Sequence, residues 1–536
     1  MNNKALQLHE EDDIAVALKN LSQGEMVVLG NFELELKEEI PAKHKFAMRN
    51  LAKGQNVIMY GEIVGQATKE ISKGAAITRD NIIHESSKFS IRESNYVWKA
   101  PAGLERTFLG YKREDGQVGT ANYWLVFPLV FCENKNIETL KEAFEIALGY
   151  RKPNPFLNHV LANLQNQDSI SEKTPFIEFE SPFENVDGIR FITHQLGCGG
   201  TRQDAQTLCH LLAGYVNNPN IAGATVLSLG CQNAEFQIFQ DRLNEIQKPY
   251  SKPVYLCEQQ HFGTTEAFLK AAIEKTIIGL KEANEVSRTP QPISKLVIGL
   301  ECGGSDGFSG ISANPTLGRV SDLVIASGGS AILSEFPELF GAEQNLIDRC
   351  LSIDLAEKFA KLMSSYNERA KSVGSGFDMN PSPGNIKDGL ITDAMKSLGA
   401  AKKGGLAPIS DVLDYTEYVK KPGLNLLCTP GNDVESTTGL AGSGANLILF
   451  STGLGTPTGN PICPVIKVSS NTQVKSRMSD IIDFDTGEII TGSKSVNKMG
   501  DELMDFVIEV ASGSRKAKAD LNSNFDFIPW KRGVSL

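Results

Sequence analysis

A glycine-rich stretch from Glu301 to Pro315 carries the residue types best suited to chemistry. It reads Glu–Cys–Gly–Gly–Ser–Asp–Gly–Phe–Ser–Gly–Ile–Ser–Ala–Asn–Pro and follows an apolar run that predicts a strand, Lys295–Leu300. A tight backbone path with exposed N–H groups can bind an anion, and an acid beside a thiol can bind a metal ion. The alternative is an ordinary turn after a buried strand. The density of polar, ligand-capable groups makes the stretch a candidate site.

Three predicted strands lead into a cysteine. The strands and their cysteines are Gly188–Thr193 with Cys198, Ala224–Leu229 with Cys231, and Lys295–Leu300 with Cys302. Strands alternate with helices in this part of the chain, which predicts parallel sheets whose ligands bind beyond the carboxyl ends of the strands. For any one of these cysteines, a buried structural residue is the alternative. Because all three cysteines follow the carboxyl end of a predicted strand, a shared site is suggested, although the sequence does not show that the three lie close together.

Composition and charge exclude several classes of protein. The chain has 536 residues, a net charge of −11 and a pI near 5.4, so it offers no basic surface for nucleic acid. No apolar stretch reaches the length of a membrane span, and the acidic start lacks the basic and apolar regions of a signal peptide, so we expect none. The nine cysteines include no Cys-x-x-Cys pair, which predicts free thiols in a reducing cytoplasm. Zinc-ribbon and iron–sulfur spacings are absent, so any metal ligands must come from distant segments.

The chain divides into four predicted parts. Residues 1–90 are expected to form a small all-β module, residues 91–106 a linker, residues 107–250 a second, α/β domain, and residues 251–536 a C-terminal α/β domain. The β module contains an internal echo, in which an apolar residue is followed by two small or polar residues and a glycine: Leu21–Gly24, Leu51–Gly54 and Ile71–Gly74. Each echo predicts a turn, and short β-rich runs follow at least the first two.

Two further motifs, Pro41–Ala47 and Leu447–Gly459, resemble functional sites. In Pro41–Ala47, His44 and Lys45 lie side by side in a strand-like loop, and a solvated loop histidine is the alternative to a catalytic one. The glycines of Leu447–Gly459 superficially match a dinucleotide fingerprint, but their spacing is wrong and no P-loop lysine follows. We therefore expect no nucleotide site there.

Several segments together resemble the altronate/galactarate dehydratase family. They are Ala42–Ala47, Gly116–Asn122, Leu229–Cys231, Glu301–Pro315, Ser334–Glu338, Gly341–Glu343, Asn380–Asn385, Pro430–Asp433 and Phe450–Gly453. The resemblance covers nearly the whole chain in order, and Gly423–Leu427 with Ile482–Gly487 lean toward the altronate branch. It implies an N-terminal SAF (β-clip) module followed by two α/β portions with largely parallel sheets. It also implies removal of water from a sugar acid, most simply D-altronate to 2-dehydro-3-deoxy-D-gluconate, aided by a divalent metal such as Fe²⁺ or Mn²⁺.

The implied chemistry suggests roles for particular residues. The proton beside a carboxylate is weakly acidic, so the reaction needs a base, an acid for the departing hydroxyl, and a cation for the developing charge. We expect the catalytic groups to be His44, Lys45 and His194. We expect substrate-binding groups at Gly303, Gly304, Ser305, Asp306, Asn314, Asn385 and Asp433. We expect metal ligands at Cys198, Cys231, Cys302 and Asp80, and thiolate ligation would favour iron.

Departures from the family pattern leave the substrate open. Thr78–Asp80 stands where a His-x-His pair is usual, Ala121 and Leu454 where arginines are usual, Gln232 where a glutamate is usual, and Ile386 where a lysine is usual. Loss of these groups suggests altered substrate contacts, or a metal site that is changed. The alternatives are therefore a galactarate dehydratase, another hydroxy-acid lyase, or a silent member that binds a sugar acid. The oligomeric state also stays open, with a homo-oligomer as one alternative.

Overall fold

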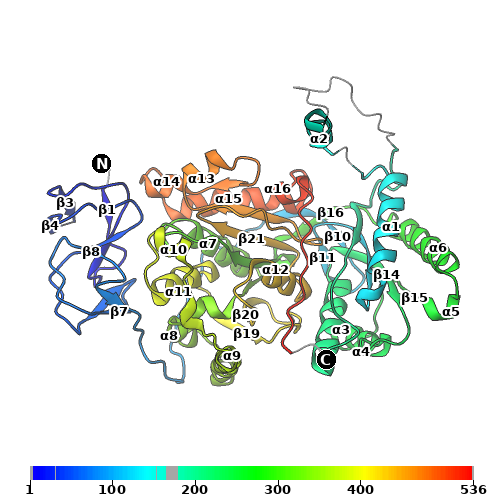
Figure 1. The fold of residues 1–536 in the computed structure, drawn as a ribbon, viewed down its shortest axis with the longest axis horizontal. Helices are drawn as coiled ribbons and strands as arrows, with labels where there is room; N and C mark the ends of the chain where they lie inside the picture. Colours follow the sequence, from blue (N-terminus) through cyan, green and yellow to red (C-terminus); the bar gives the residue numbers. More distant parts are fainter. Residues whose placement is uncertain (1–3, 31, 152–153, 165–178, 534–536) are drawn as a thin grey trace.

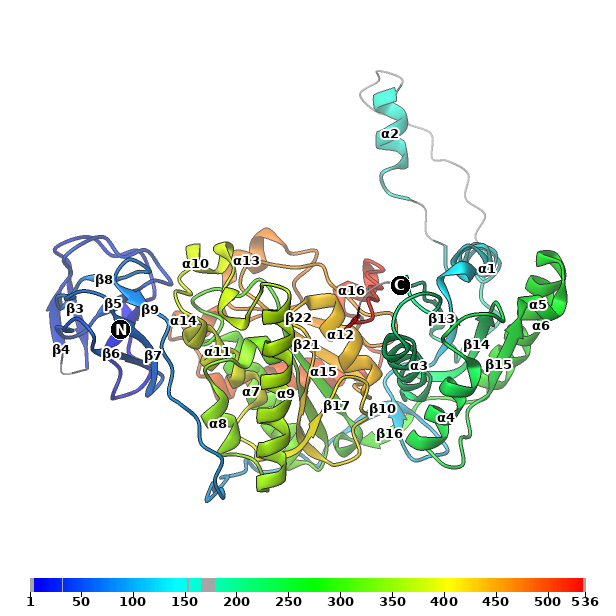
Figure 2. The same ribbon diagram turned by 60° about the horizontal axis from the view of Figure 1, so that its bottom comes forward.

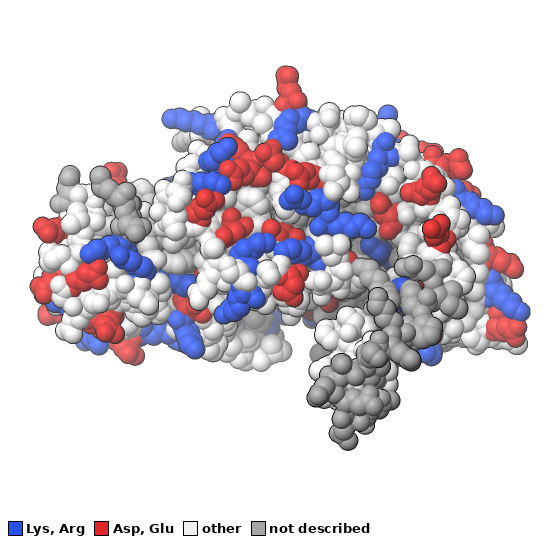
Figure 3. Space-filling model, turned by 90° about the horizontal axis from the view of Figure 1, so that it is seen from above, with Lys and Arg blue, Asp and Glu red and all other residues white. Residues whose placement is uncertain are grey.

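The three folded parts of the chain do not lie in sequence order. The computed structural model describes residues 4–30, 32–151, 154–164 and 179–533. The C-terminal domain lies in the middle, with the N-terminal β module on one side and the second domain on the other (Figures 1 and 2). On the face in Figure 3, basic side chains gather near the centre with acidic ones among them. Within the described ranges, no helix is both long enough and apolar enough to cross a lipid bilayer.

The N-terminal module consists of short antiparallel strands. They form a four-stranded sheet in the order β1-β2-β5-β8, a three-stranded sheet β6-β7-β9 and the hairpin β3-β4. The strands are β1 (Ala5–Leu6), β2 (Ile14–Ala17), β3 (Met26–Leu29), β4 (Phe32–Glu35), β5 (Lys45–Ala47), β6 (Asn56–Met59), β7 (Glu62–Ala67), β8 (Ala76–Ile77) and β9 (Ile82–Ile83). The predicted all-β module is confirmed.

The internal echo corresponds to repeated turns. Gly24, Gly54 and Gly74 all have positive φ angles, of 77°, 81° and 85°. A side chain at such a φ is strained, so glycine is the residue that suits each turn. At Gly74 a Cβ atom would also lie 2.2 Å from the carbonyl oxygen of Glu35. The spacing of these glycines therefore marks the turns of the module.

An extended linker joins the β module to the second domain. It runs from the end of β9 to β10 (Thr107–Lys112) along the C-terminal domain (Figure 2). Arg92 pairs with Asp348 at 2.9 Å, and the Tyr96 hydroxyl donates to the carbonyl of Leu406 at 2.7 Å. These contacts attach the linker to the surface of the middle domain.

The second domain is built on a parallel sheet in the order β13-β12-β14-β15. Its strands are β12 (Tyr123–Pro128), β13 (Gly188–Phe191), β14 (Ile221–Ser228) and β15 (Val254–Glu258). Its helices are η1 (Phe131–Glu133), α1 (Asn134–Ala147), α2 (Leu157–Leu164), α3 (Arg202–Asn217), α4 (Phe236–Ile246), α5 (Gln259–Phe262) and α6 (Thr265–Ala283). The predicted boundary at residue 250 is wrong, because β15 pairs with β14 and α6 packs on the same sheet. A small sheet, β11-β10-β16, with β11 (Val118–Gly119) and β16 (Thr289–Pro292), marks the passage to the C-terminal domain.

The C-terminal domain has a seven-stranded parallel sheet in the order β19-β20-β18-β17-β21-β22-β23. Its strands are β17 (Val297–Cys302), β18 (Ser330–Leu333), β19 (Ile409–Leu413), β20 (Gly423–Leu427), β21 (Leu447–Thr452), β22 (Val465–Ser469) and β23 (Phe484–Asp485). Its α-helices are α7 (Ala313–Ala326), α8 (Glu343–Ile347), α9 (Ile353–Ser372), α10 (Pro383–Lys387), α11 (Asp393–Ala401), α12 (Asp433–Gly442), α13 (Thr472–Arg477), α14 (Gly487–Ile490), α15 (Val496–Ala511) and α16 (Lys518–Leu521). The short 3₁₀ turns are η2 (Ile293–Lys295), η3 (Phe336–Leu339), η4 (Phe377–Met379) and η5 (Lys402–Gly404).

The strand order places a topological switch in this sheet. From β17 the chain moves to β18 on one side, and it later returns to β21 on the other side of β17. Ligands of parallel sheets bind in the crevice beyond the carboxyl ends of such strands. The predicted α/β architecture is confirmed, and β21 leads through its glycines to β22 without an intervening helix, as expected for a segment that is not a dinucleotide fingerprint.

A buried asparagine joins the second and C-terminal domains. The Asn220 side chain is fully buried, and its amide oxygen accepts from the Thr120 backbone N–H at 2.7 Å. Its amide nitrogen donates to the carbonyls of Asn446 at 3.0 Å and Ile462 at 2.7 Å. One apolar core also continues across the parts of the chain, so the domains share packing as well as hydrogen bonds.

We expect Asn220→Ala to lower the free energy of unfolding by about 2–4 kcal/mol, because it removes the hydrogen-bond partner of the Ile462 carbonyl and of the buried N–H groups of Thr120 and Ala121. Asn244→Ala, at an exposed position on α4, is the control. Thermal and denaturant unfolding followed by circular dichroism measure both variants. Equal stability of the two variants would contradict a joining role for Asn220.

Candidate functional site

A cavity of about 430 Å³ lies beyond the carboxyl edge of the seven-stranded sheet. Its walls come from the glycine-rich loop after β17, from η3, from the start of α10, from α11 and from the start of α12. Its position agrees with the topological switch between β17 and β21. Of the residues predicted from sequence, those lining it are Cys302, Gly303, Gly304, Ser305, Asn385 and Asp433.

Gly303 and Gly304 are required to be glycine for different physical reasons. A Cβ atom on Gly303 would lie 2.4 Å from Oδ2 of Asp433, so only glycine lets the carboxylate come this close. Gly304 has a φ of +60°, in the left-handed region that glycine enters without strain. The loop therefore presents backbone, in place of side chains, toward Asp433.

Asp433 is the titratable group best placed for acid–base work. It begins α12 and accepts a hydrogen bond from the Thr456 hydroxyl at 3.2 Å. Burial, with the charge of Glu335 nearby, raises the pKa of Asp433 to about 6, and the hydrogen bond from Thr456 opposes the rise. A carboxyl group that titrates near neutral pH can accept a proton during turnover.

A second carboxylate lines the cavity beside a lysine. Lys396 donates to Oε1 of Glu338 at 2.7 Å, and Asn380 donates to the same oxygen at 2.8 Å. Burial alone would lower the pKa of Lys396, but Glu338 holds it above its ordinary value, so the amine is charged. The other Glu338 oxygen, Oε2, is buried and has no hydrogen-bond partner within the described part of the chain. It is available to a ligand in the cavity.

A buried ion pair between Lys403 and Glu335 lies next to the cavity. Lys403 is fully buried, and its amine lies 2.7 Å from Oε2 of Glu335 and 2.7 Å from Sγ of Cys302. The same Glu335 oxygen accepts from the Cys302 backbone N–H at 3.0 Å. Burial would lower the pKa of Lys403, but Cys302 and Glu335 together raise it, whereas burial raises the pKa of the Cys302 thiol. The thiol is thus part of the support and is not free to bind a metal ion.

Glu301 lies deeper still, on β17. It is fully buried, and its Oε2 accepts from the hydroxyls of Ser334 at 3.0 Å and Ser436 at 2.5 Å. Burial, together with Glu335, raises the pKa of Glu301 well above its ordinary value, which favours the neutral form. It is a buried structural group in place of the oxygen ligand that the sequence suggested.

Two predicted substrate-binding residues, Asp306 and Asn314, do not line the cavity. Asp306 is fully buried and accepts hydrogen bonds from the side chains of Ser309, Ser470 and Asn471. Asn314 donates to the carbonyl of Gly399 and accepts from Ser451. Both have their polar atoms bonded within the protein, so they shape the loop.

The β module contacts the C-terminal domain beside this cavity. Lys43 lies 3.1 Å from Asp306 and 2.8 Å from Asp388, and Nε2 of His44 lies 3.1 Å from the carbonyl of Lys387. The buried amine of Lys45 donates to the carbonyls of Gly389 and Lys43, and burial lowers its pKa to about 8. His44 and Lys45 thus bind the segment after α10 and do not line the cavity.

The predicted metal set does not assemble. Cys198, Cys231 and His194 lie in the second domain, Cys302 lies in the C-terminal domain, and Asp80 is exposed on the β module. Within the residues that the structure describes, no three His, Cys, Asp or Glu side chains are close enough to hold one ion. The physical reason is that the cysteines follow strands of two different sheets.

Among the departures from the family pattern, only Leu454 borders the cavity. Thr78 and Asn81 bond to each other within the β module, and Gln232 bonds to Ser228 in the second domain. Ala121 is buried in the second domain. The cavity therefore differs from the pattern at one apolar position.

Sequence reasoning missed the lysines of the site. Lys396 and Lys403 lie in or just after α11, a segment that carries no motif recognised from sequence. The only local signal is a lysine pair, Lys402–Lys403, between a run of small residues and two glycines. That pattern does not distinguish a buried lysine from an exposed one.

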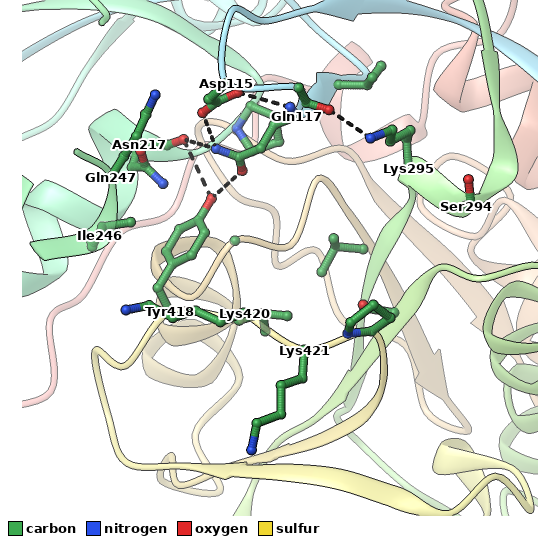
Figure 4. Close-up of a pocket in the computed structure, with 18 residues that line it drawn as sticks. Asp115, Gln117, Asn217, Ile246, Gln247, Ser294, Lys295, Tyr418, Lys420 and Lys421 are labelled. Atoms are coloured by element: carbon green, nitrogen blue, oxygen red, sulfur yellow. Dashed lines mark hydrogen bonds between the residues drawn. The ribbon is translucent and has the colours of Figure 1, made fainter. Parts of the chain in front are cut away.

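Another pocket, of about 420 Å³, lies between the second and C-terminal domains (Figure 4). It lies at the amino ends of the strands, where parallel sheets do not usually bind ligands. Its polar groups are engaged in joining segments: Tyr418 donates to Gln117, which donates to Asp115, and Lys295 donates to the carbonyl of Gly116. We therefore place the functional site at the carboxyl edge.

Comparisons with known proteins cover nearly the whole chain. Residues 3–85 match a family model described as the altronate/galactarate dehydratase SAF domain. Residues 110–284 match the second domain of D-galactarate dehydratase/altronate hydrolase, and residues 293–535 match the C-terminal D-galactarate/altronate dehydratase model. The limits of the second model agree with the placement of β15 and α6 in the second domain.

Curated relatives match over nearly their full length. The chain is 34% identical to the altronate dehydratase of Escherichia coli (strain K12), over 99% of each chain. It is 32% identical to the altronate dehydratase of Bacillus subtilis (strain 168), over 99% of each. It is 28% identical to the galactarate dehydratase (L-threo-forming) of Escherichia coli (strain K12), over 96% of this chain and 94% of that protein.

The buried pair beneath the cavity generates a stability prediction. We expect Lys403→Met to lower the free energy of unfolding by about 3–5 kcal/mol, because it leaves the Glu335 carboxylate buried without its cation. Adding Glu335→Gln should recover a large part of the loss, since the amide is neutral and its oxygen still accepts from Cys302. Denaturant unfolding of the single and double variants measures this. A double variant no more stable than Lys403→Met would show that the charge is not the cause.

Proposed function

Because this chain belongs to the altronate/galactarate dehydratase family, we propose that it is a hydro-lyase that converts D-altronate to 2-dehydro-3-deoxy-D-gluconate. The observation that supports this substrate is the charge of the cavity wall. Among the lining residues that the structure describes, Lys396 is the one lysine or arginine, and Leu454 adds an apolar side chain to the wall. One cation suits a substrate with one carboxylate, whereas a dicarboxylate such as galactarate would place its second carboxylate against an apolar side chain.

Asp433 is the proposed base. Its carboxylate faces the glycine loop at the cavity wall, and its pKa of about 6 keeps it mostly ionised at neutral pH. It can therefore remove the proton beside the substrate carboxylate, which is the difficult step of the reaction. Glu435, two residues further along α12, does not line the cavity.

Lys396 is the proposed acid and carboxylate partner. Its charged amine is held by Glu338 and Asn380 at the wall of the cavity. A fixed ammonium group stabilises negative charge that develops on the substrate and can donate a proton to the departing hydroxyl. In this proposal Asp433 and Lys396 take the roles that the sequence assigned to the two histidines and Lys45.

A divalent metal, Fe²⁺ or Mn²⁺, would find one protein ligand at the cavity wall. Oε2 of Glu338 is a buried carboxylate oxygen without a partner within the described residues, and carboxylate oxygen is a good ligand for such ions. Mg²⁺, another divalent ion, is commonly held by one or two carboxylates together with waters and oxygen atoms of the substrate. When bound, the ion would polarise the substrate carboxylate and make the adjacent proton more acidic.

The proposed substrate can be tested by measuring substrate specificity. Purified protein supplied with Fe²⁺ or Mn²⁺ should form a 2-keto-3-deoxy product from D-altronate, with a kcat/KM for galactarate at least about tenfold lower. Leu454→Arg should shift the preference toward galactarate, because it adds the second cation. Leu351→Arg, at an exposed position, is the control. No product from any aldonic or aldaric acid would contradict the dehydratase proposal and favour a silent sugar-acid-binding protein.

The role of Asp433 as the base can be tested by substitution and by pH dependence. Asp433→Asn should lower kcat by at least about 100-fold, whereas Glu435→Gln should leave it nearly unchanged. The pKa of Asp433 is raised in the folded protein, so its base form is lost as the pH falls through about 6. The kcat/KM of the unmodified protein should therefore decline below about pH 6. A profile that stays flat down to pH 5 would remove Asp433 from the role of base.

A further inference from the structure

Three cysteines of the second domain differ from the other six. Cys132, Cys198 and Cys231 are exposed, whereas the remaining six cysteines of the chain are buried. Buried cysteines behave as small apolar residues, but exposed ones offer sulfur to a metal or an oxidant. The cavity described above uses none of these three.

The topology delivers all three to one place. Cys132 follows β12, Cys198 follows β13 and Cys231 follows β14, and these are neighbouring parallel strands in the order β13-β12-β14. From β12 the chain moves to β13 on one side and then to β14 on the other, so β12 marks a topological switch. The crevice beyond the carboxyl ends of such strands is where ligands of open parallel sheets bind.

Hydrogen bonds hold the three cysteine loops together. The Phe131 N–H donates to the carbonyl of Leu196 at 3.0 Å, which joins the first loop to the second. The Ala234 N–H donates to the carbonyl of Gly197 at 3.0 Å, and the Asn233 side chain donates to the carbonyl of Cys198 at 2.6 Å. These bonds join the second loop to the third.

Close packing adds to these hydrogen bonds. The second loop also packs tightly on the first, since a Cβ atom on Gly197 would lie 2.1 Å from the carbonyl oxygen of Leu129. The three cysteine loops therefore lie together at one edge of the sheet.

His194 holds the backbone around this crevice. Its Nε2 lies 2.8 Å from the carbonyl of Pro128 at the end of β12, and its Nδ1 accepts from the Leu196 N–H at 3.2 Å. Burial lowers the pKa of His194 to about 4, so the ring is neutral and donates through Nε2. The histidine predicted to be catalytic is thus a positioning residue for the cysteine loops.

Two helix N-termini lie at the same edge. α3 begins at Arg202, four residues after Cys198, and α4 begins at Phe236, five residues after Cys231. The amino end of a helix carries a partial positive charge and stabilises a nearby anion. Both helices therefore favour thiolates and an anionic cofactor in the crevice.

We propose that Cys132, Cys198 and Cys231 bind an iron–sulfur cluster of the cubane type. Within the described residues, no three side chains lie close enough to surround a single ion, which argues against a mononuclear site. In a cluster each thiolate binds its own iron, so the three sulfur atoms need not converge on one point. Each thiol loses its proton on ligation.

Three protein thiolates leave one iron of a cubane without a cysteine ligand. That iron is open to an oxygen ligand from solvent or from a hydroxy acid, and it can act there as a Lewis acid. The cluster would be a second centre, separate from the carboxylate wall of the cavity in the C-terminal domain. Its existence does not depend on which sugar acid the protein dehydrates.

Anaerobic reconstitution of the full-length protein with ferrous iron and sulfide tests the proposal. After desalting, we expect about four iron atoms and about four acid-labile sulfides per chain. Visible charge-transfer absorption and electron paramagnetic resonance of the reduced protein should identify the cluster. These readouts measure the cofactor and not turnover, so a failed dehydratase assay would leave this test intact.

Single variants Cys132→Ala, Cys198→Ala and Cys231→Ala should each lower bound iron and sulfide at least about tenfold. Cys257→Ala, at a buried position on β15 of the same sheet, is the matched control and should retain both. Circular dichroism of the variants before reconstitution checks that each is folded.

Three results would overturn the proposal. They are an unmodified protein that retains no iron after reconstitution, a protein that binds iron without labile sulfide, and a triple alanine variant that keeps the cluster. Retention of the cluster in Cys302→Ala is expected, because that thiol is held by Lys403 in the other domain.

Discussion

The buried contact of Lys403 with Glu335 and Cys302 determines how the site of the C-terminal domain is built. It joins the carboxyl ends of β17 and β18 to η5, directly after the helix that carries Lys396. A buried charge that lost its partner would destabilise the fold by several kcal/mol, so these three segments stay together. Glu335 has a φ of 67°, a conformation that persists because the surrounding contacts hold it. The turn η3 follows directly and carries Glu338 to the cavity wall.

Contacts of the β module depend on the same edge of the sheet. Lys43 lies between Asp306, in the glycine-rich loop, and Asp388, after α10. Asp306 in turn receives hydrogen bonds from Ser309 of its own loop and from Ser470, which follows β22. A module that is first in the sequence therefore helps to hold loops from the second half of the chain. These contacts place the β module against the C-terminal domain.

Much of the fold was predictable because its signals are local. Turn glycines with positive φ, strand-length apolar runs and the alternation of strands with helices each act over a few residues. The boundary at residue 250 was wrong because nothing local distinguishes a fourth strand of the same sheet from a first strand of the next. The glycine-rich loop and Asp433 were predictable from their residue types. Lys396 and Lys403 were not, because burial of a lysine depends on distant partners such as Glu335.

The cysteines also show that local sequence patterns do not predict which residues come together in the fold. Sequence alone grouped Cys198, Cys231 and Cys302, since each comes shortly after a strand. Cys302 is the last residue of β17, where the buried amine of Lys403 meets it. Cys132 lies in the short turn η1 after β12, which leaves it exposed beside the other two loops. The two sheets thus divide the chemistry: a cavity with carboxylate and amine groups lies at one carboxyl edge, and the three exposed cysteines follow strands at the other. Strand order, which no local pattern encodes, decides which cysteine belongs to which edge.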